Sequence, residues 1–114
     1  MSQTIDRSGA QLNMRMMRGD TLTFYVARTD IDISAISDVI MTVRKTAHTE
    51  ILVQKTLGNG ITPTDDGRYF VRIAPEDTAD MLGGRYVYDV EFTVGSEVST
   101  PVHGVLELVQ DVTY

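Results

Sequence analysis

The stretch Tyr86-Val87-Tyr88-Asp89-Val90-Glu91-Phe92-Thr93-Val94 decides the fold class of this chain. Large apolar side chains occupy every second position in it, and mostly polar residues fill the positions between. A β-strand with one buried face requires this pattern, because successive side chains point to opposite faces of a sheet. The alternation is the longest clean one in the sequence, so we predict a central strand here.

Shorter runs with the same period of two lie on both sides of this strand. They occur at residues 12–16, 22–26, 39–43, 51–53, 69–73 and 98–108. Turn-forming clusters such as Gly58-Asn59-Gly60 and Asp65-Asp66-Gly67 separate the runs, and Pro63 between these clusters is predicted to end any strand. Pro101 and Gly104 interrupt the last run, which predicts either an edge strand or a strand with a bulge.

One short helix is predicted at residues 75–82. Pro75 suits the first helical position, acidic residues follow it in the first turn, and Gly83-Gly84 ends the segment. About seven strands, frequent turns and no longer amphipathic helix favour an all-β fold, an antiparallel β-sandwich with one short helical turn. Residues 11–114 are predicted to form this single domain, and residues 1–10 a mobile leader.

Composition limits the possible partners. The 114 residues contain no cysteine and carry a formal charge of −6, with sixteen acidic and ten basic residues. An acidic chain with scattered basic residues repels a phosphate backbone, so nucleic acid is not expected as a partner. The sequence has neither a signal peptide pattern nor an apolar run of about 20 residues, so we expect no membrane partner and a soluble protein made in a cytoplasm.

The sequence carries no recognisable reaction chemistry. His48 and His103 are the only imidazoles, and neither has a second histidine or a cysteine at metal-ligand spacing. No Gly-x-Ser-x-Gly or comparable nucleophile motif is present. We therefore predict no enzyme, no cofactor and no metal, with both histidines on the surface or at a rim.

Three other features are weighed as binding sites. Acidic clusters at residues 30–32, 65–66 and 76–80 could pool oxygens for calcium, but short acidic side chains also form turns and helix caps, which we favour. Arg18-Gly19-Asp20 matches an adhesive tripeptide and also an ordinary turn, and the turn is favoured. Whether a loop binds calcium or sugar is left open.

A protein interface is predicted around the methionine-rich first strand. Met14, Met16 and Met17 lie close together, and methionine suits both interfaces and cores. Met17 has the opposite parity to the other two, so the three cannot all be buried on the same face of a regular strand. Tyr25 and Phe70 also fall on the outward parity of their strands and complete the predicted interface. Filling of the core by Met14 and Met16 is the alternative, and we favour it for these two residues.

The segment from Leu82 to Val90 resembles the beginning of strand F in immunoglobulin-like domains. In those domains a leucine and a turn precede a tyrosine whose hydroxyl returns to nearby backbone. Tyr86 is the matching tyrosine and Leu82 the matching leucine. The resemblance implies an immunoglobulin-like sandwich with a structural corner at these two residues.

Most of the chain also resembles small virion proteins of phages and prophages, including N-terminal domains of upper-baseplate and tail-fibre proteins. The matching segments are Arg18-Gly19-Asp20-Thr21, Asp32-Ile33-Ser34, Asp66-Gly67-Arg68-Tyr69, Pro75-Glu76-Asp77-Thr78-Ala79 and Gly84-Arg85-Tyr86-Val87-Tyr88.

The virion resemblance implies a non-catalytic structural or assembly module in a tail, baseplate or head-associated position. Its partners would be copies of itself or other virion proteins, with a homo-oligomer as one form. Its location would be the virion, with the host cytoplasm during assembly. The alternative is an immunoglobulin-like ligand-binding or adhesion module of a bacterial protein.

Overall fold

The computed structural model describes residues 4–5, 10–27 and 33–110, and these residues form mainly β-strands. Only two short helices interrupt the strands in the described ranges. The strands are β1 (Thr4–Ile5), β2 (Ala10–Gln11), β3 (Met14–Met17), β4 (Leu22–Val26), β5 (Asp38–Arg44), β6 (Ile51–Leu57), β7 (Gly60–Pro63), β8 (Tyr69–Ile73), β9 (Gly84–Val94) and β10 (Glu97–Val109). The helices are the 3-10 helix η1 (Ile33–Ala35) and the α-helix α1 (Pro75–Thr78).

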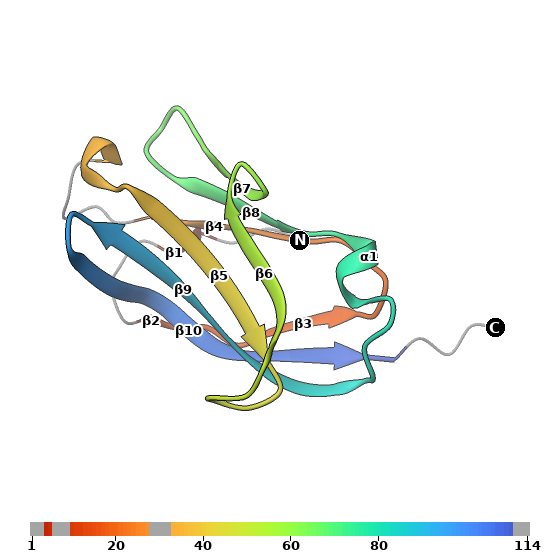
Figure 1. The fold of residues 1–114 in the computed structure, drawn as a ribbon. Coiled ribbons are helices and arrows are strands. Elements are labelled where there is room, and N and C mark those ends of the chain that lie inside the picture. Colours follow the sequence, from red (N-terminus) through yellow and green to blue (C-terminus); the bar gives the residue numbers. More distant parts are fainter. Residues whose placement is uncertain (1–3, 6–9, 28–32, 111–114) are drawn as a thin grey trace.

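All ten of these strands belong to one connected sheet. Their order is β1-β4-β8-β7-β6-β5-β9-β10-β2, and β3 pairs with β10 beside this path. Four pairings are parallel, namely β1 with β4, β6 with β7, and β10 with both β2 and β3. The sheet bends round until it is nearly closed, so that β4 and β8 face β5, β9 and β10 across the core (Figure 1).

The all-β class is therefore confirmed, but a two-sheet antiparallel sandwich of about seven strands is not. The pairing of β6 with β7 joins the two halves of the molecule, and it rests on Thr56 beside Gly60 and Leu57 beside Ile61. The sequence prediction missed β7 because Gly60 and Pro63 are typical turn and strand-ending residues. Pro63 is tolerated as the last residue of β7, where it lies opposite Tyr69 on β8.

The core holds the apolar residues that the alternation places inward. Leu22, Phe24 and Val26 are buried on β4, as predicted. Edge-on aromatic contacts cross the core, with ring centroids 6.4 Å apart for Phe24 and Tyr88 and 5.4 Å apart for Tyr69 and Phe92. These contacts pack β4 and β8 against β9, which is an interior strand between β5 and β10.

Strand β10 contains the predicted bulge and is not an edge strand. Its register with β9 shifts between Ser99 and Val102, on either side of Pro101. Proline has no backbone N–H to donate, so a bulge is the arrangement that tolerates it inside a ladder. Beyond the bulge β10 lies between β9 on one side and β2 and β3 on the other.

The predicted helix is α1, a single turn held by Asp77. The Asp77 carboxylate accepts a hydrogen bond from the backbone N–H of Ala74 at 2.7 Å and pairs with Lys55 at 2.7 Å. Thr78 is fully buried, and its hydroxyl oxygen accepts the backbone N–H of Gly19 at 2.9 Å. The tripeptide at residues 18–20 thus forms the turn between β3 and β4 that we favoured.

Part of the predicted mobile leader belongs to strands. Thr4 and Ile5 pair with β4, and Ala10 begins β2. The other residues of the predicted leader lie outside the described residues, as do residues 28–32 of the predicted crossing segment and the last four residues. Within the described ranges no helix has the length and apolar character that crossing a bilayer would need.

Candidate functional site

A groove of about 510 Å³ lies on the outer face of β5, β9 and β10. The turn between β5 and β6 forms one wall through Ala47, His48 and Thr49. The opposite side carries Gln11 of β2 and His103 of β10. This volume lies within the range of small-molecule sites, so the groove can hold a ligand or a side chain from a partner.

Two rows of side chains, set by the strand register, form the floor. Thr42, Asp89, His103 and Gln11 are cross-strand neighbours in one polar row. Arg44, Val87 and Val105 form the adjacent row, with the two valines as an apolar strip. Paired residues share a face of the sheet, so four strands, β2, β5, β9 and β10, contribute to one surface.

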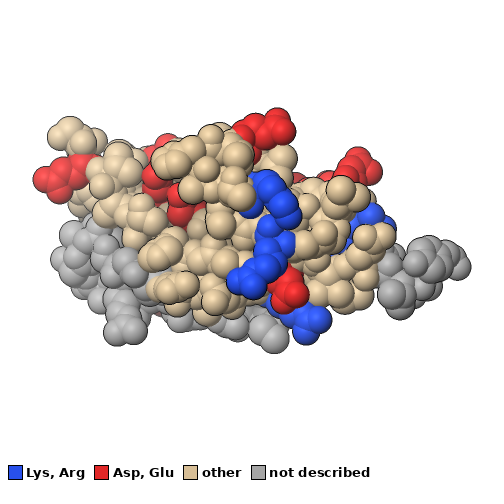
Figure 2. Space-filling model, turned by 90° about the horizontal axis from the view of Figure 1, so that it is seen from below, with Lys and Arg blue, Asp and Glu red and all other residues tan. Residues whose placement is uncertain are grey.

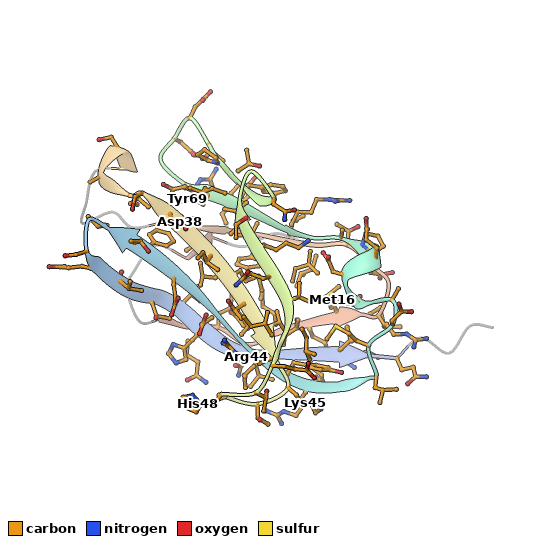
Figure 3. The ribbon with its side chains drawn as sticks, in the orientation of Figure 1. Met16, Asp38, Arg44, Lys45, His48 and Tyr69 are labelled. Atoms are coloured by element: carbon orange, nitrogen blue, oxygen red, sulfur yellow. The ribbon has the colours of Figure 1, made fainter. Side chains whose placement is uncertain are left out.

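Arg44 is fixed at the end of β5. Its Nε atom donates a hydrogen bond to the carbonyl of Thr49 at 2.9 Å. Figure 3 shows Arg44 and His48 extending to the same side of this strand end. His48 has a φ of 69°, a left-handed conformation that is uncommon for a residue with a Cβ atom. The Thr49 hydroxyl donates to the carbonyl of Thr46 at 2.6 Å and helps to hold this tight turn.

Asp89 is the titratable group most affected by the groove. Partial burial raises the pKa of its carboxyl above the ordinary value of 3.8, and the positive charges of Arg44 and His103 oppose this rise. Burial disfavours the charged form because water no longer solvates it fully. No hydrogen bond to the Asp89 side chain occurs among the described residues, so its oxygens are free to accept donors from a ligand.

The groove is lined by side chains that can bind a ligand. It offers a carboxylate, a guanidinium, two imidazoles and two hydroxyl groups above the apolar strip. In the described part of the chain neither His48 nor His103 makes a hydrogen bond to a serine or threonine hydroxyl. The described residues contain no group of three histidine, cysteine or acidic side chains that could hold a metal ion.

Tyr86 makes the contact that the sequence predicts for it. The residue is buried, and its hydroxyl donates a hydrogen bond to the carbonyl of Leu82 at 2.6 Å. The Leu82 side chain itself is exposed, so this residue takes part only through its backbone. The Lys45 ammonium lies 4.6 Å from the centre of the Tyr86 ring.

Two methionines of the predicted interface at β3 lie in the core, which is the alternative that we favoured for them. Met14 and Met16 are only 7% and 6% exposed and belong to the core. They alternate with Arg15 and Met17, so the strand buries one face. Met17 is 39% exposed and remains available to a partner.

Tyr25 and Phe70 lie together on the outer side of β4 and β8, away from the groove. They are cross-strand neighbours with ring centroids 5.2 Å apart, and both are half-buried. The Arg68 guanidinium stacks 4.2 Å from the centre of the Tyr25 ring and pairs with Asp66 at 2.8 Å. The Asp66 carboxylate also accepts a hydrogen bond from Thr64, and these contacts lower its pKa, with the Arg68 bond as the largest cause.

The sequence analysis placed His48 and His103 on the surface or at a rim but did not predict the groove. The available signal was Asp89, an acidic residue within the most apolar alternation in the chain. Its neighbours come from residues 11, 42–49 and 103–105, and only the sheet register brings them together. A single sequence does not encode that register in any short motif.

Comparison with known proteins shows likeness only at the level of structure. Neither the models of known protein families nor the curated proteins match this sequence. One similar structure is the endo-beta-1,4-mannanase from Thermotoga petrophila, with a TM-score of 0.59 and 13% identity over 87% of this chain. This chain spans only 18% of that enzyme.

Two other structures are similar over almost their whole length. The N-terminal domain of phage TP901-1 ORF48 has a TM-score of 0.56 and 13% identity, covering 96% of this chain and 99% of that domain. The match to an extracellular domain of the voltage-gated sodium channel beta4 subunit covers 91% of this chain and 95% of that chain. Its TM-score of 0.44 at 13% identity is too low to support a common fold. The mannanase and phage likenesses show that this chain shares its fold with a segment of an enzyme and with an isolated phage domain.

Proposed function

We propose that this chain is a non-catalytic structural or assembly module of a phage or prophage particle. One observation carries the proposal. The fold is shared with the N-terminal domain of phage TP901-1 ORF48 from end to end, at 96% and 99% coverage. The mannanase likeness involves a minor part of a much longer enzyme, so it gives no comparable reason to propose an activity.

The surface supports a role in protein contacts. Ile51 and Leu52 are adjacent on β6 and are 46% and 39% exposed. Met17 at the end of β3 is a third large apolar side chain that faces outward. Exposed apolar side chains on regular strands are suited to burial against another protein.

The non-catalytic part of the proposal rests on the groove chemistry. His103 and Asp89 face each other across β10 and β9, but no described hydroxyl is hydrogen-bonded to either side chain as an activated nucleophile would be. We place the protein in the virion, and in the host cytoplasm during assembly. Tail, baseplate and head-associated positions are all compatible with this proposal.

Mass spectrometry of purified particles tests the proposed function. Particles are induced from the source strain, banded in a density gradient and digested, with capsid protein as the positive reference. We expect peptides of this chain to follow the capsid protein through the gradient. Absence from the particles, with normal particle assembly after deletion of the gene, would contradict the proposal.

A second candidate, a ligand-binding or adhesion module, is favoured by the groove at Asp89 and Arg44. Thermal-shift screening against oligosaccharides and short peptides tests it. A genuine ligand should raise the melting temperature of the native chain and not that of the His103→Ala variant. Equal shifts in both proteins, or none, would remove this candidate.

A further inference from the structure

A row of basic side chains crosses one face of this acidic protein. Arg15 on β3 and Arg85 on β9 lie on either side of Glu107, their common cross-strand neighbour on β10. Lys45 donates a hydrogen bond to the carbonyl of Arg85 at 3.0 Å, and Arg44 precedes it at the end of β5. Figure 2 shows basic side chains following one another across this face, with an acidic residue among them. We name these four basic residues and Glu107 the basic row.

Neutral groups hold two of these cations in place. Lys45 is anchored by the Arg85 carbonyl and by the Tyr86 ring. Arg44 is anchored by the Thr49 carbonyl. Among the described residues of the row, one ion pair forms, between Arg15 and Glu107 at 3.7 Å, and both side chains are more than half exposed. Such a pair offsets little of the positive charge.

Two described cations outside the row are paired with carboxylates. Lys55 and Arg68 have carboxylate partners at 2.7 and 2.8 Å. In the described ranges, Arg44, Lys45 and Arg85 have no carboxylate within ion-pair distance, and the same holds for Arg72 on β8, away from the row. A chain with sixteen acidic residues thus leaves Arg44, Lys45 and Arg85 without an ion pair to a described carboxylate.

The row also contains a hollow. A depression of about 230 Å³ is lined by Arg15, Arg85 and Glu107, with Met14, Asn13 and Val105 as its other walls. A carboxylate that enters it would meet two guanidinium groups. Arginine and carboxylate form paired, charge-assisted hydrogen bonds, which are stronger than neutral ones.

We infer that the basic row is a docking surface for exposed carboxylates of a second copy of this chain. Charge complementarity supports this occupant. The row carries a formal +3, so the rest of a chain with net charge −6 carries −9. Exposed carboxylates are available elsewhere, for example Asp65, Glu76, Asp80 and Glu97.

The contact would be heterologous, because the basic row of one copy would meet carboxylates on a different part of the next copy. Repetition of such a contact produces rings or filaments, which suits a particle component. At an ionic strength of about 0.15 M, charges more than about 8 Å apart are largely screened. Local attraction at the row can then outweigh the repulsion between two acidic molecules. This inference deepens the proposed function and rests on it.

Sedimentation velocity of the full chain tests the inference with a matched pair of variants. Arg85→Glu reverses one charge of the row, and Arg72→Glu reverses an exposed strand cation outside it, with the same change in net charge. We expect native self-association to weaken by roughly tenfold or more in Arg85→Glu and to stay within about twofold in Arg72→Glu. Arg85→Gln is a milder variant in case Arg85→Glu does not fold, and thermal melts check each protein.

Three outcomes would overturn the inference. The native chain could stay monomeric at every concentration, or both variants could weaken association equally, which would indicate a net-charge effect. The row could instead bind a single-stranded oligonucleotide in an Arg85-dependent way, which would indicate a polyanion site. Particle proteomics is independent of these results, so a monomeric chain found in virions contradicts only this inference.

Discussion

At the scale of single residues, two buried tyrosine hydroxyls and one carboxylate carry most of the specific polar chemistry on β9. Tyr86 donates to Leu82 four residues earlier, whereas Tyr88 donates to the carbonyl of Leu12 at 2.6 Å from the other end of the chain. Burial raises the pKa of Tyr88 well above its ordinary value of 10.0. The first bond stabilises a local turn, and the second attaches the segment before β3 to the core.

Replacement of Tyr86 tests the structural corner that Tyr86 forms with Leu82. Tyr86→Phe keeps the ring and leaves the Leu82 carbonyl without its hydroxyl partner. We expect the free energy of unfolding to fall by about 1–2 kcal/mol. Tyr25→Phe is the control, because no hydrogen bond from the Tyr25 hydroxyl occurs among the described residues. Urea denaturation that finds equal effects for the two variants would contradict a structural role of this hydroxyl.

The raised pKa of Asp89 leads us to predict that the stability of the fold depends on pH. Its pKa is raised in the folded state, so its contribution to stability is fully present below the unfolded pKa near 3.8 and is lost as the pH rises through the folded pKa. Asp89→Asn should therefore raise the melting temperature at neutral pH and change it little near about pH 3. Glu91→Gln, two residues along the same face, is the control. A shift for Asp89→Asn that is equal at both pH values would contradict the prediction.

At the scale of elements, the close approach of β10 to the segment before β3 restricts which residue can occupy position 104. Gly104 on β10 lies against the backbone of Leu12, and a Cβ atom built there would overlap the Leu12 carbonyl oxygen. No side-chain rotation can relieve contact with a backbone atom. The glycine that interrupts the alternation of β10 is thus required by the approach of the segment before β3.

Gly104→Ala is expected to lower the free energy of unfolding by about 1–3 kcal/mol, because the segment at Leu12 must move. Val105→Ala at the next position is the comparison, since it removes volume from a half-buried outward site. Thermal melts should show the larger loss for Gly104→Ala. A larger loss of stability for Val105→Ala would mean that the backbone at Leu12 can move away from residue 104 with little loss of stability.

We predict that a charge introduced on the buried face of β3 destabilises the fold far more than the same charge on its exposed face. Met16→Glu introduces an unpaired charge in the core and should prevent folding or cost several kcal/mol, about 3 or more. Met17→Glu places the same charge on the exposed face and should change stability by no more than about 0.5 kcal/mol. Chemical denaturation measures the stability of both variants. Equal losses of stability would contradict the assignment of Met16 to the buried face and Met17 to the exposed face.

At the scale of the whole molecule, the nearly closed sheet is secured where its two halves meet. Strand β6 passes from β5 to β7, and its Lys55 reaches the Asp77 carboxylate at α1. Both side chains are mostly buried, at 12% and 17% exposed. This ion pair and the Asp77 bond to Ala74 join β6 to the connection between β8 and β9.

Asp77→Asn is expected to destabilise the fold by roughly 2 kcal/mol or more, because the Lys55 ammonium stays largely buried without its counter-charge. Lys55→Met with Asp77→Asn removes both charges and should recover part of that loss. A double-mutant cycle by guanidinium denaturation measures the coupling. Additive effects of the two changes would mean that the pair contributes nothing as a pair.

The sequence by itself determined the strand interiors and the local turns. Alternation predicts the buried faces of β4 and β9 because burial on one face of a strand imposes a period of two. The Tyr86 bond and the α1 turn are also local, since their partners lie within four residues. Neighbouring residues contain the information for such features.

Only the tertiary structure decided which strands pair and how the sheet closes. The parallel pairing of β10 with β3 joins residues about ninety positions apart and buries Met14 and Met16, which the sequence also allowed at an interface. The groove at Asp89 and the basic row at Arg85 arise from the same cross-strand register. That register results from the packing of the whole core, in which every strand restricts its neighbours, and no local pattern specifies it.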